Sequence, residues 1–241
     1  MKKILLLIPS LVIFITLSSF STLNKGSETA QPIIPSASEI GKGLKQALLQ
    51  GTAKSSDKLS AVDGFFANAA VKILIPPEAK SAENTLRDIG LGSLCDNVIL
   101  SLNRAAEDAA KQAKPIFIDA IKHMSLQDVT NILLGPQDAA TQYFKKNTSA
   151  ALLLAFKPVI QKSLDKVGAT KYYGDFAKEY DKVPFVRKIN PDISDYATQK
   201  AIDGLFIEIA LEELNIRKNI GARPTPLMQK VFAFADSKLG N

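Results

Sequence analysis

The chain contains only one cysteine and one histidine in 241 residues. Structural zinc sites need several cysteine or histidine ligands, so Cys95 and His123 cannot form one. A lone cysteine also excludes an internal disulfide framework, and the fold must therefore be stabilised by packing. We expect Cys95 to be a small buried apolar residue, with an intermolecular disulfide as the alternative.

The sequence also lacks the motifs of common nucleophilic and phosphate-binding enzymes. It has no G-x-S-x-G, and Ser125, close to His123, fits a helix N-cap better than a nucleophile. The glycines of GKGLK, residues 41–45, lie in a helical pattern and follow no strand. Asp192 and Asp195 fit a helix cap and a first-turn acid better than metal ligands. We therefore predict no catalytic residue, no metal site and no cofactor.

Positive charge is in slight excess and is not concentrated. The formal net charge is +6, and it falls to +4 without the two lysines of the N-terminal leader. The densest basic pairs are at 145–146 and 187–188. Because nucleic-acid-binding proteins usually gather their charge on one stripe or patch, this distribution argues against a nucleic-acid partner. Weak peripheral contact with anionic lipid or polysaccharide is the alternative.

The longest apolar run is at the N-terminus, and it is too short and too broken for a comfortable membrane-spanning helix. A basic MKK precedes the apolar ILLLIPSLVIFITL, and Ser19 and Ser21 have the spacing of a cleavage site. We predict that residues 1–21 are a signal peptide and that the protein is exported to the periplasm. No cysteine for lipid attachment lies nearby, and an uncleaved anchor is the alternative.

The remaining chain predicts a short tether and one all-α domain. Residues 22–37 have a glycine, two prolines and no periodicity, which is typical of a flexible tether. From Ser38, the expected first N-cap, apolar residues recur every three to four positions. The pattern predicts a single compact bundle of about nine helices over 38–238. We expect the longest helix at 193–218, and a kink or restart at Pro158.

Two later helices have specific start signals. Ser125 and Asp128 have the spacing of a capping box. Thr225 followed by Pro226 is typical of an N-cap and a first-turn proline. Both starts are separated from the preceding helix by few residues, as expected for antiparallel neighbours in a bundle.

VKILIP, residues 71–76, is the only strand-like segment, with Val71, Ile73 and Ile75 alternating. One strand cannot form a sheet alone. We therefore expect a short extended arm that lies on the helices, with a hairpin to an unidentified partner as the alternative.

Two groups of charged and polar residues are the candidate functional residues. At three- and four-residue spacings on helices, their members can pair with one another. Alanines around the first group would allow a second helix to approach closely. We predict that the two helices pack together and that Arg104 and Arg217 meet carboxylates across the contact. The 103–108 cluster is Asn103, Arg104, Glu107 and Asp108, and the 212–217 cluster is Glu212, Glu213 and Arg217.

These clusters have two interpretations. In the first they are structural ion pairs, which add little net stability but penalise wrong helix pairings, because a lone buried charge costs about 3–5 kcal/mol. In the second they form a polar pocket, where the arginines hold an anionic ligand and Glu107 acts as acid or base. We favour the first, since charges crowded in a small space neutralise one another. Accessibility of the side chains distinguishes the two.

Aromatic residues and the last helix provide two further candidates. Tyr143, Tyr173 and Tyr180 are expected to pack in the core, with an apolar ligand groove rimmed by their hydroxyls as the alternative. The terminal helix has Leu227 and Phe234 on its apolar face, which we expect to pack on the bundle. Membrane-surface binding by this helix is the alternative.

Several motifs spread along the chain resemble those of one known family. They occur in order as GLKQAL (43–48), DGFF (63–66), VKILIP (71–76), LNRAAE (102–107), AIKHM (120–124), DAATQYF (138–144), FKPVI (156–160), ALEELNIR (210–217) and VF (231–232). Over about residues 36–235 the chain resembles an uncharacterised family of exported bacterial proteins, domain-of-unknown-function family forty-one ninety-seven. The resemblance implies export and a helical domain, and it implies no activity, substrate or catalytic residue. In that family the position of His123 is often another polar residue.

We therefore predict a non-enzymatic helical binding or scaffold module of the periplasm or envelope. Its partner would be a protein, a lipid or an apolar ligand. The alternative is a metal-independent enzyme or an anion-binding protein that uses the arginine and glutamate clusters.

Overall fold

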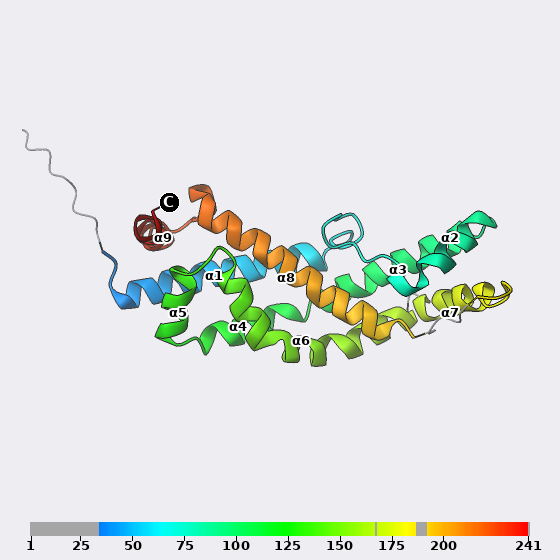
Figure 1. The fold of residues 1–241 in the computed structure, drawn as a ribbon. Coiled ribbons are helices and arrows are strands. Elements are labelled where there is room, and N and C mark those ends of the chain that lie inside the picture. Colours follow the sequence, from blue (N-terminus) through cyan, green and yellow to red (C-terminus); the bar gives the residue numbers. More distant parts are fainter. Residues whose placement is uncertain (1–33, 167, 187–191, 241) are drawn as a thin grey trace, which may run out of the picture. The chain divides into compact units, whose positions relative to one another are not determined.

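Nine α-helices follow one another in the parts of the chain that the computed structural model describes, residues 34–166, 168–186 and 192–240 (Figure 1). These ranges contain no β-strand, and the predicted all-α bundle is confirmed. The predicted signal peptide, most of the tether and the basic pair at 187–188 lie outside the described residues. The helices are α1 (Ala37–Ser60), α2 (Lys80–Asp88), α3 (Gly92–Ala110), α4 (Ala113–Lys122), α5 (Leu126–Leu133), α6 (Ala139–Lys166), α7 (Ala169–Tyr180), α8 (Ser194–Lys218) and α9 (Pro226–Leu239), with 3-10 helices η1 (Pro77–Ala79) and η2 (Ile220–Ala222).

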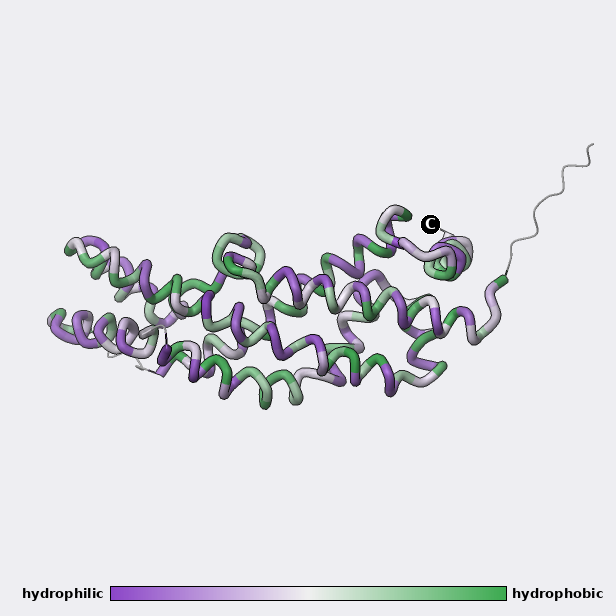
Figure 2. The backbone as a smooth tube through the Cα atoms, turned by 180° about the vertical axis from the view of Figure 1, so that it is seen from behind, coloured by the Kyte–Doolittle hydropathy of each residue, from purple (hydrophilic) through white to green (hydrophobic). Residues whose placement is uncertain are grey.

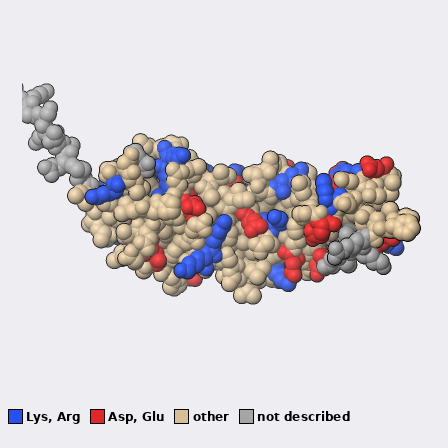
Figure 3. All heavy atoms as spheres, viewed as in Figure 1, with Lys and Arg blue, Asp and Glu red and all other residues tan. Residues whose placement is uncertain are grey.

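Helix α8 lies at the centre of the packing. It contacts α1, α3 and α6, and its contact with α6 is the most extensive in the bundle. Helices α4, α5 and α9 pack on α1, whereas α2 and α7 pack on α3. Figure 2 shows hydrophobic and hydrophilic residues alternating along most helices, as expected when one face of each is buried. On the face seen in Figure 3, acidic and basic side chains are interspersed.

Helix starts follow the capping signals of the sequence. Helix α1 begins after Ser36, whose hydroxyl accepts the Glu39 N–H while the Glu39 carboxylate accepts the Ser36 N–H at 2.8 Å. The predicted cap at Ser38 is wrong, because a capping box needs the glutamate three residues after the cap. The predicted caps Ser125 and Thr225 are confirmed.

Glu39 also joins the first helix to the last, and this contact predicts a pH dependence. The Lys230 ammonium at 2.6 Å, followed by the Ser36 N–H and hydroxyl, lowers the pKa of Glu39 from 4.5 to about 2. Since the folded pKa is the lower one, the stabilisation is complete above pH 4.5 and is lost as the pH falls towards about 2. We expect Glu39→Gln to lose less stability than the parent over this range in urea unfolding. Identical pH profiles would contradict the assignment.

Helix α6 passes through Pro158 without a break, so the predicted restart is wrong. With 28 residues α6 is longer than α8, which has 25, so the prediction that the longest helix spans 193–218 is also wrong. Proline removes the N–H that would bond the carbonyl four residues earlier, that of Leu154. Because Leu154 and Pro158 are both exposed, water can solvate this carbonyl.

The segment 71–76 is an extended arm, as predicted. Val71, Ile73 and Ile75 are buried, whereas Leu74 is exposed. The described residues provide no strand to pair with it, so the hairpin alternative is wrong.

Two helical glycines are expected to respond oppositely to alanine. At Gly43 an added Cβ would lie 2.6 Å from Val231 Cγ2 and 3.3 Å from the Leu227 carbonyl in α9, whereas at Gly174 it would meet open space. Overpacking costs about 1–3 kcal/mol and alanine gains up to about 1 kcal/mol of helix propensity. Gly43→Ala should therefore destabilise the protein by about 1–2 kcal/mol, and Gly174→Ala should stabilise it by about 0.5–1 kcal/mol in urea unfolding. A Gly43→Ala protein as stable as the parent would show that α9 does not pack closely on α1.

Candidate functional site

The 103–108 cluster begins with Asn103, which is fully buried and faces the extended arm. Its Oδ1 accepts the Ile73 N–H at 2.9 Å, and its Nδ2 donates to the Ile73 carbonyl at 2.7 Å. Nδ2 also donates to the Ile99 carbonyl one turn back in α3 at 2.8 Å. The amide thus pairs with the arm as a neighbouring strand would.

Glu107 connects α3 to the turn that follows α1. Its Oε2 pairs with Arg104 at 2.7 Å, and its Oε1 accepts the backbone N–H groups of Phe65 and Phe66 at 3.2 and 3.3 Å. Arg104 also pairs with Asp63 at 2.7 Å. Asp63 lies in this turn and has a positive φ of 67°. The buried Glu107 carboxylate therefore accepts two backbone N–H groups for which the turn itself provides no acceptor.

Asp108 points to a different neighbour, α6. It accepts a hydrogen bond from the Ser163 hydroxyl at 2.9 Å and pairs with Lys111 at 2.6 Å. The Lys111 ammonium lowers the pKa of Asp108. The 103–108 residues thus contact the arm, the 63–66 turn and α6, so they do not converge on one site.

In the 212–217 cluster, Glu213 caps the N-terminus of α6. Its two oxygens accept the N–H groups of Ala140 and Thr141, each at 2.9 Å, and the Thr141 hydroxyl at 2.8 Å. It also pairs with Arg217 at 2.9 Å. A carboxylate at this position is favourable, because the first N–H groups of a helix lack partners and carry partial positive charge.

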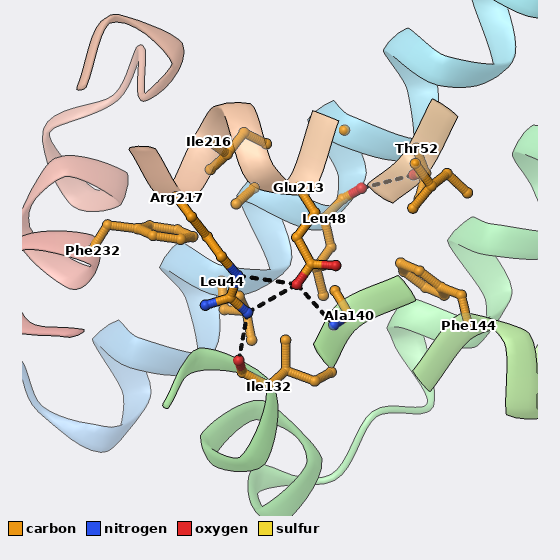
Figure 4. A pocket seen from close by; sticks show the side chains of 13 residues that line it. Leu44, Leu48, Thr52, Ile132, Ala140, Phe144, Glu213, Ile216, Arg217 and Phe232 are labelled. Atoms are coloured by element: carbon orange, nitrogen blue, oxygen red, sulfur yellow. Dashed lines mark hydrogen bonds and ion pairs between the residues drawn. The ribbon is translucent and has the colours of Figure 1, made fainter. Parts of the chain in front are cut away.

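Arg217 completes the arrangement at the end of α5 (Figure 4). Its guanidinium donates to the Ile132 and Leu133 carbonyls at 2.7 and 3.2 Å. A cation suits a helix C-terminus, where carbonyl groups lack donors. Glu213 and Arg217 therefore join α8 to the start of α6 and the end of α5. Their neighbour Glu212 joins α8 to α1 by pairing with Lys54 at 2.7 Å.

The predicted pairing of Arg104 and Arg217 with carboxylates across one helix contact is wrong. Helices α3 and α8 do pack together, and the alanines of α3 are buried. However, Arg104 pairs with Glu107 of its own helix and with Asp63, and Arg217 pairs with Glu213 of its own helix. Helical spacing indicated the pairs within each helix, but it could not indicate the backbone groups of other segments.

This geometry leaves the buried carboxylates little capacity for chemistry. A general acid or base must reach the proton that it transfers. Glu107 and Glu213 each accept bonds from at least two backbone N–H groups and one arginine. Beside Glu213 and Arg217 is a cavity of about 30 Å³, lined mostly by apolar side chains (Figure 4). That volume is far below the roughly 300–1,000 Å³ of ligand sites, so a substrate does not fit.

An open groove lies on the other side of Arg217 and Phe232, which line both the cavity and the groove. The groove has a volume of about 690 Å³, within the usual range of ligand sites of roughly 300–1,000 Å³. We call it the α8–α9 groove. Its lining is Gly135, Pro136, Gln137, Arg217, Lys218, Ile220, Arg223, Phe232, Ala235, Asp236 and Leu239.

Arg223 holds this groove together and was missed by the sequence analysis. It is buried, donates to the Ile216 carbonyl at 2.8 Å and pairs with Asp236 of α9 at 2.9 Å. Its guanidinium also lies over the Phe232 ring, 5.0 Å from the centroid. A signal was present, since an arginine just after a helix end can bond its last carbonyls.

The three tyrosines do not share a groove. Tyr173 and Tyr180 are buried in α7, as expected for core residues, and Tyr173 stacks on Phe176 at 5.4 Å. Burial raises the pKa of Tyr173 to about 12. Tyr143 lies on α6 near α4, and its hydroxyl is 3.5 Å from the Ala120 carbonyl.

His123 and Asp119 are exposed and 3.5 Å apart, beside a surface hollow that Tyr143 also lines. Ser125 is occupied as the cap of α5. Among residues 34–166, 168–186 and 192–240, no group of three or more histidine, cysteine, aspartate or glutamate side chains could hold a metal ion. Across the same ranges, every helix is too short or too polar to cross a membrane.

The comparisons with known proteins give one match. A family model described as "Protein of unknown function (DUF4197)" matches residues 35–233. Searches of curated proteins and of solved structures found no match. The matched range runs from the cap of α1 into α9, so it includes both clusters and most of the lining of the α8–α9 groove.

Proposed function

The chain belongs to the DUF4197 family, whose function is unknown, and we propose that it is a non-enzymatic helical binding module of the bacterial periplasm or envelope. The observation that carries this proposal is the saturation of the candidate reactive groups. Glu213 and Arg217 are occupied by backbone groups and by each other, and Glu107 is occupied by backbone N–H groups and by Arg104. This occupancy supports structural ion pairs and disfavours the enzyme and anion-binding alternative.

The α8–α9 groove is the proposed binding site. Ile220 and Leu239 are exposed there beside the apolar Phe232 and Ala235. Lys218 is exposed in the same groove and forms no ion pair with any described residue. Exposed apolar residues beside a lysine that no described acid pairs fit an amphipathic molecule that has an apolar chain and an anionic head. We therefore propose this class of ligand.

Native mass spectrometry of the protein purified from whole cells tests the binding site. We expect a small amphipathic molecule with an apolar chain and an anionic head to copurify with the parent and to be lost from Leu239→Glu. The matched control is Ile89→Glu, which places the same charge at an exposed apolar residue after α2, outside the groove. Binding of the fluorophore N-phenyl-1-naphthylamine provides a second reading of the same variants. Equal binding by all three proteins, or none by the parent, would reject the groove.

Export is tested separately, because it depends only on the leader. We expect cell fractionation to place the protein in the periplasm, with the mass of residues 22–241. A full-length protein in the cytoplasm would contradict the proposed location while leaving the groove experiment valid.

A further inference from the structure

The terminal helix is not the surface that a membrane would contact. Val231 and Phe232 of α9 are buried, and Leu227 and Phe234 are partly buried against the core. The apolar face of this helix thus packs on the bundle, as the sequence analysis expected. A different helix has the combination of exposed apolar residues and lysines that membrane-surface binding requires.

Helix α6 exposes an apolar segment in its middle. NTSAALLLAF, residues 147–156, contains no charged residue. Leu154 is 78% exposed and Leu153 is 46% exposed, and Ala150 and Ala151 beside them are also exposed. The middle turns of α6 are mostly green in Figure 2. Two adjacent exposed leucines with small neighbours form a continuous patch, unlike the single exposed residues that are common on protein surfaces.

Helix α6 also has the largest excess of basic over acidic residues among the described helices. Helix α6 has five lysines and one acidic residue, Asp165, and therefore a net charge of +4, whereas the whole chain has +6. Lysines lie on both sides of the apolar segment, at 145–146 before it and at 157 and 162 after it. Lys146 and Lys162 are exposed and form no ion pair with any described residue. Lys146 interacts electrostatically with Asp128 of α5 without a direct ion pair, so both lysines can still contact an external partner.

Acidic residues on the neighbouring helices are mostly paired. Asp195 of α8 binds Lys157 at 2.7 Å, and Asp203 of α8 is 3.9 Å from Lys200. On the other side, Asp119 of α4 lies beside His123, and Asp128 of α5 lines the same hollow as Asp119 and Ala151. These acids reduce the positive electrostatic potential around α6 without making it negative.

We propose that the outward face of α6 binds the surface of a bilayer that contains anionic lipids. Leu153 and Leu154 enter the boundary between headgroups and acyl chains, while Lys146 and Lys162 contact lipid phosphates. The proposal rests on the proposed envelope location, where such a surface is present. It concerns a different face from the α8–α9 groove.

The experiment uses the absence of tryptophan from the chain. In full-length Leu154→Trp the only tryptophan reports on this face alone, even if residues 1–21 also bind the vesicles. Vesicles of phosphatidylglycerol and phosphatidylcholine with brominated acyl chains should shift its emission to the blue and quench it. Vesicles of phosphatidylcholine alone should have little effect. The matched control is Val62→Trp, since Val62 is 80% exposed and lies near the acidic Asp57 and Asp63 in sequence.

A second pair of changes tests the role of charge. Adding Lys146→Glu and Lys162→Glu to Leu154→Trp should weaken vesicle binding at least tenfold, whereas adding Leu239→Glu in the groove should leave it unchanged. The proposal is overturned if Leu154→Trp is not quenched, if Val62→Trp is quenched equally, or if charge reversal has no effect. The groove variant keeps a failure of the proposed ligand site distinct from a failure of membrane binding.

Discussion

Replacement of Glu213 by alanine is expected to lower the free energy of unfolding by about 3–5 kcal/mol, because one partner of a buried ion pair is removed. Arg217 would keep its charge with its side chain only 11% exposed. The N–H groups of Ala140 and Thr141 at the start of α6 would lose their acceptor as well. The effect is large because α6 and α8 form the most extensive helix contact of the bundle.

Urea unfolding followed by circular dichroism measures this loss. The matched control is Asp203→Ala in the same helix, where the carboxylate is exposed and 3.9 Å from Lys200. Exposed pairs of this kind contribute about 0–1 kcal/mol, so the control should remain close to the parent. A Glu213→Ala protein as stable as the control would mean that Glu213 is not a structural cap.

Replacement of Asn103 by leucine is expected to cost about 2–4 kcal/mol, since leucine keeps the volume but cannot bond the arm. The buried N–H and carbonyl of Ile73 would both lose their partners. Each unsatisfied buried group costs about 1–3 kcal/mol. We expect the arm at 71–76 to detach before the helices unfold.

Limited trypsin digestion reads this detachment directly, because Lys72 lies within the arm. Cleavage after Lys72 should be faster in Asn103→Leu than in the parent under native conditions. Asn97→Leu, an exposed change in the same helix, is the control and should leave the cleavage rate unchanged. Equal rates in all three proteins would show that the amide does not hold the arm.

The helices and the arm could be predicted from the sequence because their determinants are local. Ser125 and Thr225 carry their caps within three residues, and the alternation of the 71–76 segment indicates its buried face. Of the kink or restart predicted at Pro158, the restart is wrong, because the sequence does not reveal that the unpaired carbonyl would face solvent. Rules based on neighbouring residues fail where the solvent exposure of a backbone group determines whether a helix continues.

The candidate site was predictable only in part for a similar reason. The spacing of Glu213 and Arg217 indicates their pair, which the structure contains. No spacing indicates that Glu213 caps a helix that begins more than seventy residues earlier. Ala140, whose N–H group Glu213 accepts, lies 73 positions before it. Glu107 has the same role towards the turn at Phe65. Such contacts depend on the tertiary arrangement, and helical periodicity contains no information about them.

The buried charges are structural pairs saturated by protein groups. A double-mutant cycle on Glu213 and Arg217, with alanine at each position and stability measured in urea, distinguishes such a pair from two independent side chains. We predict a coupling of about 1–3 kcal/mol for this pair. For Glu213 and Arg104 we predict a coupling within about 0.5 kcal/mol of zero, because Arg104 pairs instead with Glu107 and Asp63. A coupling near zero between Glu213 and Arg217 would contradict the account.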